Sequence, residues 1–366
     1  MKVMNTSAIW GALVGDACGA TLEFCDDKIT EEMARWAMTM PGGGSLRVGR
    51  GQITDDGELT LALWSVLRGR ETFHGFPLEA VAEAYAAWYL SFPFDIGRTC
   101  SLAFDVLSEW THEDMEITDA LCSIDDMSRR SEANGALMRV TPIATWWASH
   151  PLQKNGICVE ETAQMAAAAA EQDARLSHPG RVTRDANAVY TYAVTLLLLG
   201  CSPFETVERV DRMASKRCAE VQQWVEESKR EWGASDARVL IGHVRHAFVA
   251  ALWFLRRPEI GYEEAICMVL QRGGDTDTNA AIVGGLVACY QPIPKAMKEA
   301  VARFDCVEAQ PTPWRHSSNF VNPIPPSHGE EAHSGTSNRA RPMGRERPKE
   351  YGVKYQMTMD TSQPIK

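Results

Sequence analysis

The sequence predicts an all-α protein whose body is a single compact multi-helix domain. Apolar residues recur every three to four positions through most of residues 1–305, which is the period of helices that bury one face. The apolar–polar alternation that is typical of half-buried strands is nearly absent. No Pro-, Gly- or Ser-rich linker divides this part of the chain, so we expect the helices to share one core.

Runs of helical period, separated by Gly and Pro residues such as Pro142 and Pro203, define the expected helices in chain order. They cover residues 4–20, 55–69, 78–90, 99–110, 160–172, 185–199, 205–232, 236–256, 262–271, 277–290 and 294–303. An alanine run, Ala166–Ala170, supports the helix at 160–172 because alanine has the highest helix propensity. The 205–232 segment has the clearest pattern, with one apolar and one charged face.

Composition and charge argue against a nucleic-acid-binding protein and separate an acidic domain from a basic tail. The chain has 366 residues and a net charge of −11, and the negative charge is concentrated before residue 310. An acidic body repels phosphate backbones, so we expect no nucleic-acid partner. We expect the domain to cover residues 1–309. Residues 310–366 are weakly basic and hold nearly half of the 18 prolines, so we expect a disordered or surface-associated tail, with Arg339–Lys349 as a candidate targeting or partner-binding patch.

The cysteines and the lack of long apolar runs indicate a cytoplasmic protein. None of the 10 cysteines forms a Cys-x-x-Cys pair, and we expect reduced, mostly buried thiols. No run of 18 apolar residues exists, which argues against a membrane span. The short apolar segment Ala8–Val14 lacks the basic start and the clear cleavage site of a signal peptide.

Two acidic loops far apart in the chain are the strongest functional signal. Each loop follows a glycine turn and precedes an apolar helix, and each offers a Thr hydroxyl and two carboxylates. The candidate ligands are Thr54, Asp55, Asp56, Asp275, Asp277 and Thr278. Helix N-capping is the alternative reading, but a cap explains one polar residue per helix and not this set. Hard oxygen donors favour Mg²⁺ or Mn²⁺ over zinc, and so many of them could hold two ions.

Weaker signals accompany these loops. Gly11, Gly15 and Gly19 share one helix face, most simply for close helix packing, and Glu23 follows where that helix should end. Three further loops carry candidate polar or backbone groups, and each is also explained as an ordinary turn: 93–99, 132–139 and 177–180. The 132–139 loop could present backbone N–H groups to phosphate at a helix start.

Two features resemble sites without the supporting pattern. His243 and His246 are three residues apart on the expected 236–256 helix, but no Cys or His partner has zinc-site spacing. We interpret them as ordinary surface or core histidines. The 11 tryptophans are interpreted as core residues rather than ligand platforms.

Taken together, these motifs resemble the ADP-ribosylglycohydrolase family, which includes dinitrogenase reductase-activating glycohydrolases and ADP-ribosyl-arginine and ADP-ribosyl-serine hydrolases. The resemblance runs in order over about residues 5–305 and departs from the family pattern at Ala133 and Ser177, where small residues replace Gly and Thr. It implies an all-α domain of the ADP-ribosylglycohydrolase type with a central cleft that holds two Mg²⁺ or Mn²⁺ ions.

The resemblance also implies roles for individual residues. The Thr and Asp residues of the two acidic loops would be metal ligands. Glu23 would lie near the metals, and Asp95 would act as acid or base near the ribose, with Asp56 in the same catalytic group. The substrate-binding residues would be Gly97, Asn134, Gly135, Ala136, Met138 and His178, the last on the ribose or the adenosine side.

The implied function is hydrolysis of the glycosidic bond in ADP-ribosylated protein side chains, with arginine as the first candidate and ADP-ribose as the product. Such a reaction needs an acid for the leaving group and an activated water. ADP-ribosyl-serine, small ADP-ribose derivatives and a non-catalytic binder that neutralises an ADP-ribosyltransferase remain alternatives. The intact set of candidate ligands argues against the non-catalytic alternative.

Overall fold

The computed structural model describes residues 4–112, 115–149, 158–233 and 236–304. These residues form helices and no strand, and two isolated bridges are the only β-type pairs among them. The helices are α1 (Ser7–Gly19), α2 (Glu31–Ala37), α3 (Asp55–Leu67), η1 (Thr72–His74), α4 (Leu78–Tyr89), α5 (Arg98–His112), α6 (Ile117–Ser128), α7 (Thr141–Ser149), α8 (Val159–Ala174), α9 (Arg181–Leu198), α10 (Pro203–Ala214), α11 (Ala219–Glu227), α12 (Val244–Leu255), α13 (Tyr262–Leu270), α14 (Thr276–Val287) and α15 (Lys295–Ala302). The all-α prediction is therefore confirmed over the described part of the chain.

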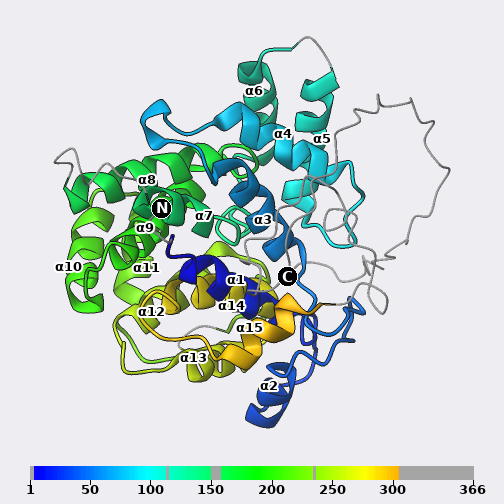
Figure 1. Cartoon of the computed structure of the whole chain (residues 1–366), viewed down its shortest axis with the longest axis vertical. Helices are drawn as coiled ribbons and strands as arrows, with labels where there is room; N and C mark the ends of the chain where they lie inside the picture. Colours follow the sequence, from blue (N-terminus) through cyan, green and yellow to red (C-terminus); the bar gives the residue numbers. More distant parts are fainter. Residues whose placement is uncertain (1–3, 113–114, 150–157, 234–235, 305–366) are drawn as a thin grey trace, which may run out of the picture. The chain divides into compact units, whose positions relative to one another are not determined.

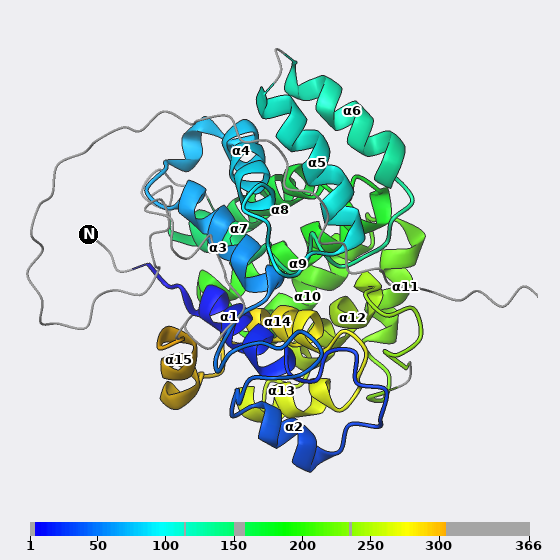
Figure 2. The ribbon, with the colours of Figure 1, turned by 90° about the vertical axis from the view of Figure 1, so that its right-hand side faces the viewer.

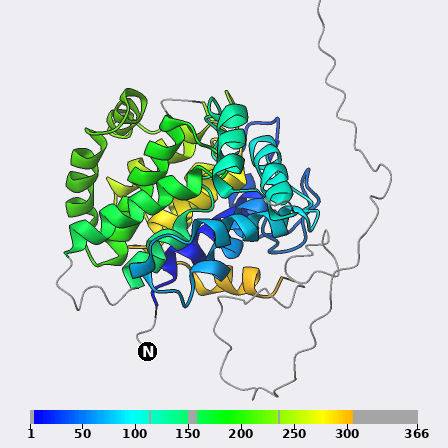
Figure 3. The same ribbon diagram turned by 90° about the horizontal axis from the view of Figure 1, so that it is seen from above.

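A central helix pair organises the domain. α1 and α14 lie side by side in Figures 1 and 2, and every residue of α14 is buried. α12 and α13 pack against α14, while α3, α7 and α15 pack against α1. In Figure 3 the green helices around α8 to α11 and the cyan helices around α4 to α6 lie on opposite sides of this pair.

Glycines allow the central pair to approach at backbone distance. A Cβ atom on Gly11 would lie 2.2 Å from the carbonyl oxygen of Gly284, and one on Gly15 would lie 2.1 Å from that of Ala280. A Cβ on Gly19 would lie 2.4 Å from Cα of Asp277. The glycine face of α1 therefore packs on α14, as the sequence predicts, and it brings the end of α1 against the start of α14.

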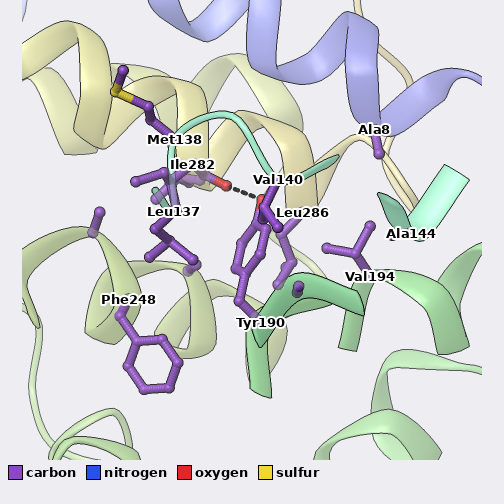
Figure 4. Close-up of a cluster of buried hydrophobic side chains, with 14 of the residues drawn as sticks. Ala8, Leu137, Met138, Val140, Ala144, Tyr190, Val194, Phe248, Ile282 and Leu286 are labelled. Atoms are coloured by element: carbon purple, nitrogen blue, oxygen red, sulfur yellow. Dashed lines mark hydrogen bonds between the residues drawn. The ribbon is translucent and has the colours of Figure 1, made fainter. Parts of the chain in front are cut away.

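Buried hydroxyls pair with the helix backbone around this contact. Tyr262 donates to the carbonyl oxygen of Gly11 and Tyr190 to that of Ile282, both at 2.7 Å. Figure 4 shows the Tyr190 bond among side chains of α7, α9, α12 and α14. Paired hydroxyls of this kind let tyrosine fill a core without an unsatisfied polar group.

Several predicted boundaries are wrong. The expected 205–232 helix is two helices, α10 and α11, because the turn at residues 215–218 is held by α9: the Cys218 amide and the Arg217 guanidinium both bond Asp185. The expected 236–256 helix begins only at Val244, where the His243 ring accepts the Arg245 amide as an N-cap.

Three helices were not predicted from the sequence: α2, α6 and α7. Pro142 was interpreted as a breaker, yet it stands in the first turn of α7, where its missing N–H has no helical partner to lose. Residues 135–139 form consecutive turns before α7, so the 132–139 loop does not contain the helix start that was considered for it.

The described cysteines are free thiols, and four of them are buried: Cys18, Cys100, Cys218 and Cys267. The expectation that most are buried is therefore wrong. Among the residues that the structure describes, none of the helices has the length and apolar character that crossing a membrane would take. The predicted tail, residues 310–366, lies outside the described residues.

Candidate active site

A cavity of about 320 Å³ lies where the N-termini of α3, α5 and α14 meet the loop after α1. Five carboxylates line it: Glu23, Asp55, Asp95, Asp275 and Asp277. Of the other predicted site residues, Gly97, Asn134, Gly135, Met138, His178 and Thr278 also line the cavity. The chain thus brings most of the predicted residues together from segments that are far apart in sequence.

The two acidic loops meet behind this cavity. Thr278 at the start of α14 donates to Asp56 Oδ2 over 3.1 Å, and Thr54 Oγ1 lies 3.3 Å from the same oxygen. Thr54 and Asp56 are buried below the lining residues. Asp56 therefore joins the two loops, although 222 residues separate it from Thr278.

Neither acidic loop caps its helix in the ordinary way. Thr54 precedes α3 and Asp275 precedes α14, and neither side chain makes a cap hydrogen bond. Two amides at the start of α3 are satisfied instead by Asp16 of α1, which accepts from the Thr54 amide at 3.0 Å and the Gly57 amide at 2.8 Å. The side chains of Asp55 and Asp56 are consequently not needed to cap α3.

Asp16 is the main residue that sequence reasoning did not select. It is fully buried, and it also accepts the Thr54 hydroxyl at 3.0 Å. Burial, partly offset by these donors, raises its pKa to about 8. A signal for Asp16 was present in the sequence: it is a single aspartate in an otherwise apolar helix, four residues after Ala12 and therefore on the same face. An aspartate buried in such a helix needs hydrogen-bond partners.

The carboxylates lie close together, and some of their oxygens have no hydrogen-bond partner. One carboxylate oxygen each of Glu23, Asp95 and Asp277 lies within 4.8 Å of the other two. Asp56 Oδ1 and Glu23 Oε2 are buried and have no hydrogen-bond partner. Buried oxygens of this kind are costly unless a cation or a donor faces them.

Burial and mutual repulsion raise the pKa values of these carboxyl groups. Burial first, and then the charge of Asp275, raise the pKa of Glu23 to about 9 and that of Asp55 to about 6. The pKa values of Asp56, Asp95 and Asp277 are raised well above the usual range, again mainly by burial. So many buried carboxyl groups, all oxygen donors, fit hard divalent cations, which would compensate their charge.

The side of the cavity that residues 134–139 form is built on a buried ion pair. Arg139 is fully buried, lies 3.2 Å from Asp173, and donates to the carbonyl oxygen of Gly135. Asn134 at the start of the same loop donates to Asp275 Oδ2 at 2.7 Å. The loop is therefore tied to the core at one end and to an acidic residue of the cavity at the other.

His178 closes this side as a neutral ring. It is fully buried, its Nδ1 lies 2.9 Å from Ser177 Oγ, and its Nε2 has no partner. Burial and the nearby Arg139 lower its pKa to about 3. A Cβ on Gly135 would lie 3.0 Å from the His178 ring, so glycine is needed for this close approach.

Some predicted residues lie elsewhere. Ala136 is completely buried and does not line the cavity. His243 pairs with Glu132 at 3.0 Å and His246 with the carbonyl oxygen of Val239 at 2.8 Å, and neither belongs to the acidic group. The interpretation of these histidines as structural agrees with these contacts.

The chain is similar in sequence and in fold to ADP-ribosylglycohydrolases. The family model for ADP-ribosylglycohydrolase matches residues 6–317. A protein of Acanthamoeba polyphaga mimivirus named as an ADP-ribosyl glycohydrolase is 27% identical over 325 residues, which cover 84% of this chain and 93% of the viral protein. The ADP-ribosyl-[dinitrogen reductase] glycohydrolase of Rhodospirillum rubrum is 37% identical over 144 residues, or 39% of this chain and 45% of that protein. A solved structure described as an ADP-ribosylglycohydrolase-related protein complex shares the fold, with a TM-score of 0.60, 23% identity, and coverage of 81% of this chain and 90% of its own.

Proposed function

Because the chain belongs to the ADP-ribosylglycohydrolase family, whose enzymes hydrolyse ADP-ribose conjugates, we propose that it removes ADP-ribose from modified arginine side chains of proteins. Water adds to C1 of the ribose while the bond from C1 to the arginine nitrogen breaks, and the products are ADP-ribose and free arginine. An ADP-ribosyltransferase would supply the modified protein. The observation that carries the proposal is the convergence of the two acidic loops on one cavity.

We propose that Thr54, Asp55, Asp56, Asp275, Asp277 and Thr278 hold two Mg²⁺ or Mn²⁺ ions. The unpartnered Asp56 Oδ1 and the all-oxygen donor set support this assignment. When bound, such ions supply Lewis-acid chemistry and offset the charge of the carboxylates. Glu23 and Asp95 border the proposed ligands and remain available for proton transfer.

Asp95 is the proposed acid. It lines the cavity, its carboxyl group hydrogen bonds the Asp55 carboxyl, and burial and repulsion raise its pKa, which favours the protonated form. In the proposal it protonates the departing nitrogen, and Glu23 accepts the proton that the attacking water loses. Bound cations would lower the raised pKa of Glu23 and so favour the carboxylate that this role needs. Asn134, Gly135, Met138 and His178 bind the ribose and diphosphate side of the ligand, with the free Nε2 of His178 as one polar contact.

Release of ADP-ribose from peptides tests the proposal. Arginine- and serine-ADP-ribosylated peptides are incubated with the full chain in Mg²⁺, in Mn²⁺ and in chelator, and free ADP-ribose is measured by mass spectrometry. We expect metal-dependent release from the arginine peptide. Asp277→Asn should abolish release, whereas Asp119→Asn on the exposed start of α6 should not alter it. Release from the serine peptide alone would reassign the linkage, and no release from either peptide would contradict the proposal.

A further inference from the structure

The side chains that line the candidate active site are mostly acidic, and one of them is a cation. Five carboxylates line the cavity, and among the described lining residues Arg98 is the one cation, since His178 is neutral. A diphosphate brings negative charge into this acidic surrounding and would be repelled by it. The proposed divalent cations would offset part of this repulsion, and a positive side chain that faces the diphosphate would favour binding further.

Arg98 is available for a ligand. Its side chain is exposed, and it forms no ion pair within the described residues, although the carboxylates line the same cavity. Other arginines of the chain are engaged, as Arg139 is with Asp173 and Arg245 with Glu227. The charge of Arg98 is thus not consumed by neutralising the acidic group.

The position of Arg98 is unfavourable for its own helix. It is the first residue of α5, and no acidic residue occupies the first turn of that helix. A helix N-terminus carries partial positive charge and favours anions, so a cation there is destabilising by a few tenths of a kcal/mol. Gly97, Thr99 and Cys100 beside it also line the cavity, and the Gly97 amide already donates to Asp55 Oδ2 at 3.4 Å, so the start of α5 faces negative charge in this cavity.

A second unsatisfied group lies in the same cavity. His178 Nε2 is completely buried and has no partner, and His178 lines the cavity. Buried polar atoms are normally satisfied by a protein atom, an ordered water or a ligand. The exposed cation, the helix N-terminus and the unpartnered ring nitrogen therefore border one cavity, in which a single polar ligand can meet all three.

We infer that Arg98 binds the diphosphate of ADP-ribose and strengthens its binding in the acidic cleft. The inference rests on the proposed function. A guanidinium presents a planar pair of N–H donors that fits phosphate oxygens, and the N-terminal amides of α5 add neutral donors to the same group. Arg98 positions the substrate and takes no part in proton transfer.

Calorimetric titration of ADP-ribose into the full chain with saturating Mn²⁺ tests the inference. Arg98→Ala should weaken ADP-ribose binding by about 10- to 100-fold, because a charge-assisted contact is lost. The ADP-ribose affinity of Arg98→Lys should lie between those of wild type and Arg98→Ala, because lysine keeps the positive charge but lacks the paired N–H donors of a guanidinium. Raising the salt concentration should weaken binding less in Arg98→Ala than in wild type.

Two controls make the test specific. Arg212→Ala removes an exposed arginine that lines a different cavity, and it should leave ADP-ribose binding within about twofold. Titration of Mn²⁺ alone should give an affinity for Arg98→Ala within about threefold of wild type, because Arg98 contacts none of the proposed ligands.

The outcomes separate the inference from the function on which it rests. If wild type binds Mn²⁺ but not ADP-ribose, the proposed function is wrong. If wild type binds ADP-ribose and Arg98→Ala binds it equally well, the function stands and the role of Arg98 is wrong. A variant that loses only turnover of the modified protein would make Arg98 a contact for the target protein and overturn the inference, as would a loss of Mn²⁺ binding.

Discussion

A single buried carboxylate illustrates how the site depends on residues outside the cavity. Asp16 accepts three hydrogen bonds from Thr54 and Gly57, so it fixes the start of α3 and the direction of Asp55 and Asp56. It touches no part of the cavity itself. We therefore regard it as a positioning residue.

Replacing Asp16 by asparagine tests that role. The amide group keeps the shape but turns one acceptor into a donor facing N–H groups. We expect the free energy of unfolding to fall by about 1–3 kcal/mol and Mn²⁺ affinity to fall at least about tenfold. Chemical denaturation and Mn²⁺ titration measure both, with Asp119→Asn as the matched control. A stable variant with unchanged Mn²⁺ affinity would refute the positioning role.

Removing a proposed ligand should have the opposite effect on the metal-free protein. Asp277→Ala deletes one carboxylate from a group whose members repel each other. Mn²⁺ affinity should fall by one to several orders of magnitude, each about 1.4 kcal/mol, while the thermal midpoint in chelator holds or rises. A cap would instead stabilise the protein with or without metal. Hydrolysis at the wild-type rate by Asp277→Ala would refute the metal assignment.

His178 should make stability depend on pH. Its pKa is lowered to about 3 in the folded state, mainly by burial, against an ordinary value of 6.5. Below pH 6.5 only the unfolded chain takes up this proton, so the contribution of the group is complete above that pH and is lost as the pH falls toward 3.

The size of the effect follows from the shift. Relative to His178→Gln, the unfolding free energy of wild type should fall by about 2 kcal/mol between pH 6.5 and pH 5. Urea denaturation of both proteins at several pH values measures this difference, and the carboxylates contribute equally to each. A difference that does not change with pH would show that His178 is not buried as a neutral ring.

At the scale of elements, the contact between α1 and α14 couples folding to the site. The same contact that buries both helices presses Gly19 against Asp277, a proposed ligand. Helix packing and ligand geometry are therefore determined by one surface.

Gly15→Ala should destabilise the protein by about 1–3 kcal/mol or more, because the new methyl group overlaps the backbone of Ala280. Gly19→Ala should in addition lower Mn²⁺ affinity, because it displaces the start of α14. Gly261→Ala is the matched control, since a Cβ there meets nothing within 4 Å, and it should change stability by less than about 1 kcal/mol. Equal stability of all three variants, measured by denaturation, would contradict this account.

For the whole molecule, the acidic body and the basic tail are expected to be functionally separate. The family match ends at residue 317, and no candidate site residue follows it. Deleting residues 318–366 should leave Mn²⁺-dependent release of ADP-ribose within about twofold of the full chain. Loss of Mn²⁺ binding on deletion would show that the tail contributes to the site.

Periodicity and composition were sufficient to predict the helical class, the single core and most of the longer helices. They failed where a contact from elsewhere decides a boundary. The break between α10 and α11 depends on Asp185 of α9, and the late start of α12 depends on a ring that caps it. A pattern along one segment carries no information about such partners.

The sequence by itself determined which residue types are available: two Thr- and Asp-rich loops after glycine turns, and a helix with glycines on one face. Only the tertiary structure decided that Asp56 meets Thr278, that Asp16 takes over the capping of α3, and that Arg98 lines one cavity with five carboxylates. The physical reason is that local propensity acts over a few residues, whereas the energies of buried charges depend on neighbours that the packing of α1 on α14 brings together.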